Sequence, residues 1–343
     1  MNQIQSSNGP RTTWNTVYHS SFKRCFDEIQ RVHLTHTSLY PEGVRIIGCT
    51  GLGKTELAVA IKAELPDRQT RFGPRRPVLY IEVPPAPTKK SILVAMLQSL
   101  GDRCPTWGTV NAMELRLLAL LKEARVELLI FDEVQHFVLQ GSKISMSAAA
   151  DTFKRIINLA KLPIVLMGMP SSTALFTASS QLRSRVGPEL RLDAFSWDEP
   201  EQRLHFLSLI KAQFPLGFDN DTFLFVHDVA LRLWYATYGV PRAIRQLVFQ
   251  LDHQRRVLRQ STLDLAILSK AFKTAIWPSA PPHRNPFDVA FNMKALILDG
   301  EPWERDPIEG GHHDATHASV AAAIVRRCTQ RTSKASDGSK AAA

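Results

Sequence analysis

The chain has 343 residues, of which 44% are hydrophobic and 22% are charged, a composition typical of a folded globular protein. It has no run of about 20 apolar residues, and residues 1–14 lack the apolar core of a secretory signal, so we expect a cytoplasmic protein without a membrane-spanning segment. The formal net charge of +10 favours a polyanionic partner, although such a charge also serves solubility.

Short apolar runs alternate with amphipathic stretches over the first 193 residues. The amphipathic stretches predict helices at 22–32, 55–65, 91–100, 112–124 and 148–161. The apolar runs predict buried strands at 44–47, 78–83, 127–133 and 163–168, with a fifth strand at 189–193. This alternation is typical of an α/β fold in which a five-stranded parallel sheet is covered by helices on both faces.

The composition changes near residue 197. Beyond it, helical periodicity without strand signals predicts a small all-helical domain, with helices at 199–213, 220–237, 241–256 and 262–275. From Trp277 onward the chain is first rich in proline and then polar and of low complexity. We therefore expect a flexible N-terminus (1–13), an α/β domain (14–197), a helical domain (198–275) and a tail (276–343) that is largely disordered or docks on a partner.

The stretch GCTGLGKT, residues 48–55, stands between a predicted strand and a predicted helix. Its spacing matches G-x-x-x-x-G-K-[ST], in which glycines shape a tight loop whose backbone N–H groups surround phosphate oxygens. Lys54 would supply charge to the β and γ phosphates of ATP, and Thr55 would offer its hydroxyl to Mg²⁺. A glycine-rich turn that binds nothing is the alternative, which this context disfavours. The predicted ATP-binding residues of the loop are Gly48, Cys49, Thr50, Gly51, Leu52, Gly53, Lys54 and Thr55.

An acidic pair, Asp132 and Glu133, ends the predicted strand ELLIFDE. The strand would place both carboxylates at the carboxyl edge of the sheet, beside the glycine-rich loop. Asp132 would hold Mg²⁺ directly or through water, and Glu133 would polarise the attacking water. The alternative is a solvated acidic turn. The pair favours Mg²⁺-dependent ATP hydrolysis, because a hydrolase needs a group that activates water.

Two arginine-containing segments are candidates to complete the site. QLRSRVG places Arg183 and Arg185 after the fourth strand, where a guanidinium could reach the γ phosphate of an adjoining subunit, and we favour Arg185. GVPRAI, residues 239–244, opens a helix with Arg242 in its first turn, positioned to sense nucleotide in its own subunit. A solvated arginine and ordinary Gly-x-Pro helix punctuation are the respective alternatives.

With these residues assembled, the chain resembles the AAA+ ATPases and, more closely, the transposition regulators called TniB, which are relatives of TnsC and MuB. The resemblance covers roughly residues 14–275. It is carried by GCTGLGKT, VLYIEVPPAPTKKSILVAML, LGDRCPTWGTV, LLIFDEVQHF, FKRIINLAKLPIVLMGMP, QLRSRV and GVPRAI. The VPPAPT and DEVQH segments narrow it to this family.

The resemblance implies an ATPase that assembles with ATP into rings or filaments around duplex DNA, without sequence preference. Such a protein is not itself the transposase: it marks the target and stimulates a partner transposase, with a target-selection adaptor as a further partner, and ATP hydrolysis releases it. The resemblance also implies DNA-backbone contacts from Lys89, Lys90 and Thr109. Lysine and threonine suit phosphates and do not read bases. A solvated lysine and a helix-capping threonine are the alternatives.

One position departs from the AAA+ pattern, in which a polar residue commonly ends the fourth strand and orients the attacking water. Here Gly168, Met169 and Pro170 stand at that point. Ser171 or Ser172 is a candidate substitute, and slow hydrolysis is the other interpretation.

Three other features of the sequence have both a functional and a structural interpretation. The histidines His312, His313 and His317 lack cysteine or carboxylate partners at ligand spacing, so we expect no metal besides Mg²⁺. The segment HQRRVLRQ, residues 253–260, could touch DNA or form a solvated helix face. The segment PPHRNPF and Trp303 could form a docking peptide or serve no role.

The sequence is also compatible with two functions other than that of a DNA-bound regulator of transposition. The first is an AAA+ motor or secretion-associated ATPase that remodels a protein partner, and such proteins usually carry an extra domain or a membrane span. The second is a small-molecule phosphotransferase, which would act as a monomer and would not need Arg185 from a neighbour. Hydrolysis that depends on DNA and on protein concentration would distinguish the regulator from both.

Overall fold

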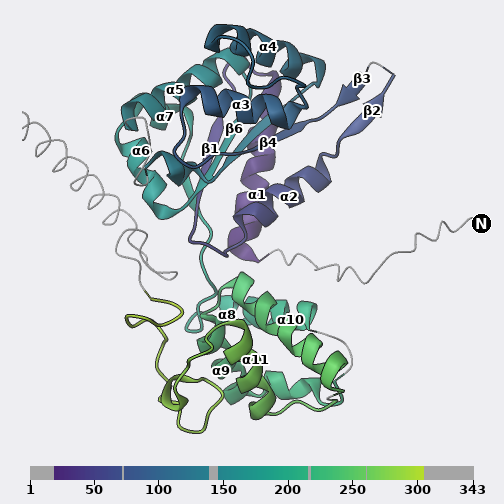
Figure 1. Ribbon diagram of the computed structural model, residues 1–343, viewed down its shortest axis with the longest axis vertical. Coiled ribbons are helices and arrows are strands. Elements are labelled where there is room, and N and C mark those ends of the chain that lie inside the picture. Colours follow the sequence, from purple (N-terminus) through teal and green to yellow (C-terminus); the bar gives the residue numbers. More distant parts are fainter. Residues whose placement is uncertain (1–18, 72, 139–145, 215–217, 260, 305–343) are drawn as a thin grey trace, which may run out of the picture.

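The computed structural model describes residues 19–71, 73–138, 146–214, 218–259 and 261–304. Its centre is a parallel sheet in the order β4-β5-β6-β1-β7 with helices on both faces (Figure 1), as predicted. The strands are β1 (Gly43–Ile47), β4 (Val78–Glu82), β5 (Leu128–Asp132), β6 (Ile164–Gly168) and β7 (Glu189–Arg191).

The register brings the carboxyl ends of the strands to one edge of the sheet. Ile47 of β1 is paired with Gly168 of β6, and Glu82 of β4 is paired with Asp132 of β5. Because parallel strands end at the same edge, the segments that follow β1, β5 and β6 lie close together there. This edge carries both the glycine-rich loop and the acidic pair.

The strands β4, β5 and β6 each contribute side chains to two apolar cores, since successive side chains point to opposite faces. Leu129 and Phe131 of β5 join one core, and Leu128 and Ile130 of the same strand join the other. Burial on both faces explains why the strands read as continuous apolar runs. The first core lies under α3 (Lys89–Leu100), α4 (Val110–Glu123) and α5 (Met146–Ala160), and the second lies under α1 (Ser20–His33) and α2 (Lys54–Glu64).

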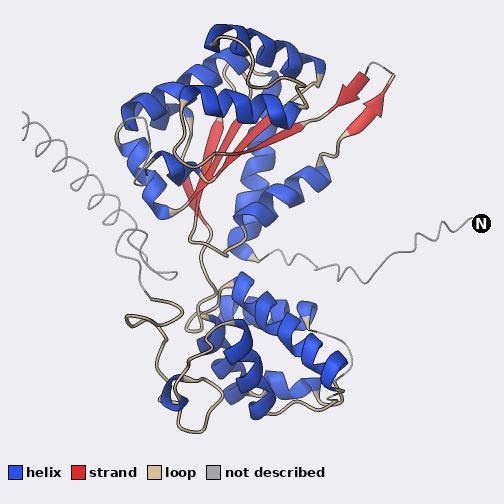
Figure 2. Cartoon of the chain, in the orientation of Figure 1, coloured by secondary structure: helices blue, strands red, loops and turns tan. Residues whose placement is uncertain are grey.

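Two short strands and two short α-helices were not predicted. The strands β2 (Arg68–Thr70) and β3 (Gly73–Arg75) form an antiparallel hairpin that extends away from the main sheet (Figure 2). Two short helices, α6 (Thr173–Thr177) and α7 (Ser180–Arg185), follow β6. The hairpin strands are polar and three residues long, so they carry no apolar alternation.

Residues 200–275 form a helical unit around a core of its own. Its helices are α8 (Pro200–Gln213), α9 (His227–Thr237), α10 (Pro241–Leu258) and α11 (Leu265–Ala275). Among their buried side chains are Phe206, Leu233, Leu247, Leu251 and Phe272. Across the described residues, no helix combines the length and apolar character that crossing a membrane requires.

Part of the expected tail is folded, so the expectation of disorder is wrong for residues 276–304. Apolar side chains between the prolines close the core of the helical unit, and the buried ones are Ala280, Phe287, Phe291 and Leu296. Arg284, only 5% exposed, holds this segment together. Its guanidinium donates to Glu301 at 2.5 Å, to Asn292 Oδ1 at 3.0 Å and to the Ala295 carbonyl at 2.7 Å. The histidines of residues 312–317 lie outside the described residues.

Candidate nucleotide site

The glycine-rich loop between β1 and α2 has a backbone that side chains would disturb. Gly51 and Gly53 have φ angles of 85° and 99°, in the left-handed region that favours glycine. A Cβ on Gly48 would lie 2.7 Å from the carbonyl oxygen of Leu192. Gly53 is the N-cap of α2, so the loop ends at a helix N-terminus, where free N–H groups and the helix dipole favour an anion.

Lys54 is 7% exposed, and its ammonium group lies against the loop itself. Its Nζ donates to the carbonyl oxygens of Gly48 at 2.6 Å and Cys49 at 3.0 Å. The neighbouring Thr55 donates its hydroxyl to Asp132 Oδ2 at 3.1 Å. The loop therefore places a positive charge and a hydroxyl group beside the end of β5.

Asp132 is 1% exposed and has three hydrogen-bond donors around its carboxylate. Besides the Thr55 hydroxyl, Tyr80 donates its phenolic O–H to Oδ2 at 2.9 Å, and the Glu133 N–H donates to Oδ1 at 2.9 Å. Burial and the Asp132 carboxylate raise the pKa of Tyr80 above its ordinary value, so Tyr80 stays a donor. These bonds fix the orientation of the carboxylate at the strand end.

A cavity of about 420 Å³ lies between the loop and the start of α10. It is lined by Thr50, Gly51, Gly53, Lys54, Thr55, Glu56, Glu133, Pro241, Arg242, Arg245 and Gln246. The two sides of this cavity are joined by hydrogen bonds. The Arg242 N–H donates to the Gly51 carbonyl at 3.1 Å, and Arg245 forms an ion pair with Glu56 at 2.8 Å. The predicted residues Glu133 and Arg242 therefore face the same cavity as the loop.

The start of α10 is held to the α/β part at a close backbone crossing. The Phe195 N–H donates to the Gly239 carbonyl at 3.0 Å, and the Trp234 indole donates to the Phe195 carbonyl at 2.7 Å. A Cβ on Gly239 would lie only 2.1 Å from the Phe195 oxygen, so glycine alone fits this crossing.

The other predicted site residues lie outside the cavity. Arg185 is exposed at the end of α7 and does not line it. Lys90 is exposed in the first turn of α3. Thr109 accepts a bond from the Ala112 N–H at 3.3 Å and so caps α4, as one interpretation of the sequence allowed.

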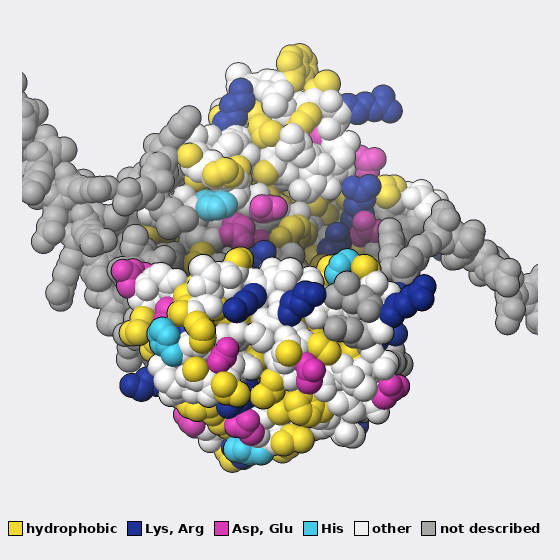
Figure 3. Space-filling view, turned by 60° about the horizontal axis from the view of Figure 1, so that its bottom comes forward, with side chains coloured by type: hydrophobic (Ala, Val, Ile, Leu, Met, Phe, Trp, Pro, Cys, Tyr) yellow, Lys and Arg dark blue, Asp and Glu magenta, His cyan; other side chains and the backbone are white. Residues whose placement is uncertain are grey.

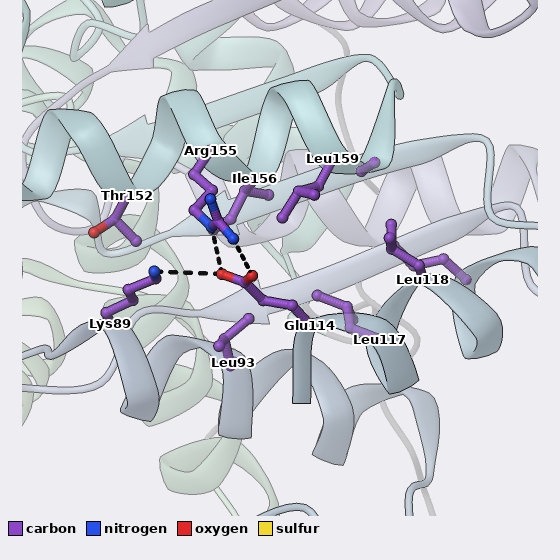
Figure 4. A pocket seen from close by; sticks show the side chains of 11 residues that line it. Lys89, Leu93, Glu114, Leu117, Leu118, Thr152, Arg155, Ile156 and Leu159 are labelled. Atoms are coloured by element: carbon purple, nitrogen blue, oxygen red, sulfur yellow. Dashed lines mark hydrogen bonds and ion pairs between the residues drawn. The ribbon is translucent and has the colours of Figure 1, made fainter. Parts of the chain in front are cut away.

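Lys89, whose side chain is partly exposed, forms an ion pair with the buried Glu114. Glu114, 5% exposed, accepts hydrogen bonds from Arg155 and lies 3.4 Å from the Lys89 ammonium, next to a small apolar cavity between α3, α4 and α5 (Figure 4). The Arg155 guanidinium, with Lys89, holds the pKa of Glu114 below its usual range. On the face drawn in Figure 3, basic side chains alternate with acidic ones, so the net positive charge forms no single patch there.

Sequence reasoning missed several residues that shape the site. Tyr80 carried a signal, a tyrosine in an otherwise aliphatic buried strand. Gln135, 2% exposed, bonds to Glu133 and to the Met169 N–H; the DEVQH segment that contains it was singled out, but nothing in the sequence reveals these bonds, since most glutamines lie in water. Ser172, by contrast, was a sequence candidate for orienting the attacking water; it donates its hydroxyl to the Met169 carbonyl at 2.6 Å and does not line the cavity.

The chain shares its fold with several proteins of known structure. The chain is similar to the Aeropyrum pernix ORC1 protein in complex with DNA, with 17% identity, coverage of 76% of this chain and 67% of that chain, and a TM-score of 0.53. It is also similar to the Aeropyrum pernix ORC2 protein (ADPNP-ADP complexes), with 16% identity, coverage of 78% and 70%, and a TM-score of 0.55. The chain is likewise similar to Cdc6p from Pyrobaculum aerophilum, with 13% identity, coverage of 77% of this chain and 69% of that chain, and a TM-score of 0.54. No curated protein matches the chain.

At such identities the structural likeness concerns the fold alone, which is the P-loop AAA+ fold. A comparison with models of protein families assigns the chain more narrowly than the fold does. The model described as Bacterial TniB protein matches residues 12–196, more than half of the chain, and includes both the glycine-rich loop and the acidic pair. The chain therefore belongs to the bacterial TniB family.

Proposed function

We propose that this protein is an ATP-dependent regulator of DNA transposition that binds duplex DNA without sequence preference. It would assemble as a homo-oligomer on target DNA and recruit or stimulate a partner transposase, and ATP hydrolysis would release it. One observation carries this proposal: in a TniB-family chain, the phosphate loop, Glu133 and Arg242 line a single cavity.

The residues around the cavity fit ATP with Mg²⁺. The Thr55 hydroxyl and the Asp132 carboxylate approach to 3.1 Å, which gives the hard oxygen ligands that Mg²⁺ prefers. The loop N–H groups and Lys54 would hold the phosphates, and Lys54 would exchange its two carbonyl partners for phosphate oxygens. When bound, Mg²⁺ would neutralise charge that develops on the phosphates. Glu133 would orient water and accept its proton.

The assembled state would depend on neighbouring subunits. In our proposal Arg185, exposed and outside the cavity of its own subunit, reaches the γ phosphate of an adjoining subunit. Arg242 acts from within the subunit, and the helical unit serves as a lid over the nucleotide. Bound ATP would then favour assembly by linking two subunits, and loss of the γ phosphate would weaken it. We extend the proposed lid to residue 304, because residues 277–304 share its core.

DNA would be held through its backbone. Lys90 and Thr109 are exposed and could reach phosphates, and Lys89 would have to leave Glu114 to do so. The net charge of +10 supports a polyanionic partner. The Aeropyrum pernix ORC1 protein, which shares the fold, was solved in complex with DNA. A transposase and a target-selection adaptor are the proposed protein partners.

The first test combines DNA binding with particle size. Wild-type protein and Lys54→Ala would be mixed with duplexes of unrelated sequence, with ATP or ADP, and followed by light scattering. We expect large assemblies on every duplex with ATP only, and none with Lys54→Ala. Lys62→Ala, an exposed lysine of the same helix, is the matched control and should behave as wild type.

Two outcomes would contradict the proposal in different ways. Particles of constant size that ignore DNA in every nucleotide state would exclude a DNA-bound regulator. If such protein still hydrolysed ATP, the result would favour an AAA+ ATPase that remodels a protein partner.

A further inference from the structure

A continuous chain of hydrogen bonds joins the phosphate loop to Glu133. The Gly48 N–H donates to the Gly168 carbonyl at 3.1 Å. The N–H of the same peptide unit, that of Met169, donates to Gln135 Oε1 at 3.0 Å. Gln135 Nε2 in turn donates to Glu133 Oε2. One peptide unit at the end of β6 thus connects the first residue of the loop to the side chain that faces the nucleotide cavity.

The orientation of the Gln135 amide follows from its partners. The Met169 N–H can only donate, so the atom that faces it must be the amide oxygen. The NH₂ group is then directed at Glu133, whose carboxylate accepts. With both ends of the amide bonded and only 2% of Gln135 exposed, rotation of the side chain would break two bonds in a buried place.

Gly168 makes room for this arrangement. A Cβ at position 168 would lie 3.0 Å from Gln135 Oε1 and 3.0 Å from Ser172 Oγ, tighter than an ordinary van der Waals contact. The Gln135 amide can therefore lie beside the end of β6 only because residue 168 has no side chain. The amide, which follows β5, fills the space that a side chain on β6 would take.

Glu133 needs such support because its own backbone is unusual. Its φ angle is 58°, in the left-handed region that non-glycine residues rarely adopt. This turn directs the side chain to the cavity, where a carboxylate without a second anchor could adopt several rotamers. Gln135 supplies that anchor on one carboxylate oxygen and leaves the other free to accept a proton.

We propose that Gln135 is the positioning residue for Glu133, fixing the carboxylate at a set place relative to the phosphate loop. This inference rests on the proposed function, since it assumes that Glu133 activates water for ATP hydrolysis. Gln135 would act through Glu133, since Glu133 lines the cavity and Gln135 does not.

The test compares steady-state ATP hydrolysis by wild type, Gln135→Glu and Gln135→Met, in the presence of duplex DNA. Gln135→Glu keeps the acceptor for the Met169 N–H but replaces the donor to Glu133 with a repelling oxygen. Gln135→Met is similar in length, removes both bonds and adds no charge. Both variants should lower kcat by about 10- to 100-fold, because a misplaced general base loses most of its effect. The KM for ATP and the affinity for a fluorescent ADP analogue should stay within about twofold, since the phosphate contacts remain.

A double variant separates positioning from folding. In a Glu133→Gln background, Gln135→Glu should change the rate by less than about twofold, because the residue acts only through Glu133. Gln98→Glu, the same change at an exposed site on α3, is the matched control and should keep the wild-type rate.

The outcomes distinguish the two hypotheses. If Glu133→Gln loses ATP hydrolysis but both Gln135 variants keep the wild-type rate, the role of Gln135 is overturned and the proposed function stays intact. Equal rates in wild type and Glu133→Gln would overturn both. A parallel loss of nucleotide affinity, or equal losses from Gln135→Glu with and without Glu133, would assign Gln135 a purely structural role.

Discussion

At the scale of single residues, His19 stands at the N-terminal end of α1 as an uncharged imidazole. Its Nδ1 accepts a bond from the Phe22 N–H at 3.4 Å, which needs the unprotonated nitrogen. The side chain is 6% exposed, and the centroid of its ring lies 4.8 Å from the centroid of the Phe195 ring. Burial, with a smaller contribution from His205, lowers the pKa of His19 to about 4.

Because the pKa of His19 is lowered, we expect the stability of the protein to depend on pH. Between the ordinary pKa of 6.5 and the folded pKa of about 4, the unfolded chain binds a proton at His19 and the folded chain does not. The free energy of unfolding should therefore fall as the pH drops through this window, by up to roughly 3 kcal/mol. Urea unfolding at pH 7.5, 6 and 5 would measure it. His19→Asn, which can still cap the helix but does not titrate, should flatten the dependence.

Exposed histidines provide the control for this experiment. His253 lies on the solvent side of α10, and His253→Asn should leave the pH dependence unchanged. An equal slope in wild type and His19→Asn would show that other groups cause the loss of stability.

At the scale of elements, the segment 277–304 depends on a buried ion pair. Arg284 and Glu301 have side chains only 6% and 7% exposed. Burial alone would raise the pKa of Glu301, but the hydrogen bonds and charge of Arg284 lower it overall. Arg284→Met would leave a buried carboxylate unpaired, which costs about 3–5 kcal/mol. We expect the urea midpoint to fall and trypsin to cleave this segment much earlier than in wild type.

An exposed ion pair gives the matched comparison. Arg256 is 52% exposed and pairs with Asp252 at 2.9 Å on α10, so Arg256→Met should cost less than about 1 kcal/mol. Cleavage of the Arg284→Met variant at the wild-type rate would mean that the segment holds by its apolar contacts alone.

Local rules of sequence predicted the sheet, the glycine-rich loop and the acidic pair. Strands buried on both faces read as apolar runs, and the loop is marked by glycines whose φ angles no other residue adopts easily, such as Gly51. Hydrogen bonds between segments that are far apart in the sequence were not predicted. Gln135 and Met169 are 34 residues apart, and the sequence does not reveal their bond. The fold of segment 277–304 was not predicted either. Its prolines suggested an open chain, although its apolar residues close the core of the helical unit.

At the scale of the whole molecule, the proposed role of Arg185 implies that one subunit completes the site of another. Arg185→Ala would keep its own phosphate loop but lack the arginine, and Lys54→Ala would keep the arginine but lack ATP. Each variant alone should hydrolyse ATP slowly. A mixture of the two should recover activity well above the sum of the separate rates, because mixed neighbours contain complete sites.

The neighbouring Arg183 provides the control for this mixing experiment. It is also exposed and lies two positions earlier on α7, so Arg183→Ala should hydrolyse ATP alone, without a partner variant. A mixture of Arg185→Ala and Lys54→Ala that shows only the summed rates would contradict the role of Arg185 in a neighbouring site.

The glycine crossing at Gly239 and Phe195 has a mechanical consequence. It joins the α/β part to one end of α10, whose 18 residues make a rod about 27 Å long. Arg242 stands near the crossing, beside the phosphate loop, and Arg255 and Arg256 stand near the far end of α10. A tilt of the helical unit by only about 10° about the crossing would carry the far end of α10 through about 5 Å. Because Leu247 and Leu251 hold α10 in the core of the helical unit, the whole unit would move with the helix, and a small change at the nucleotide would become a large displacement of the far side of that unit.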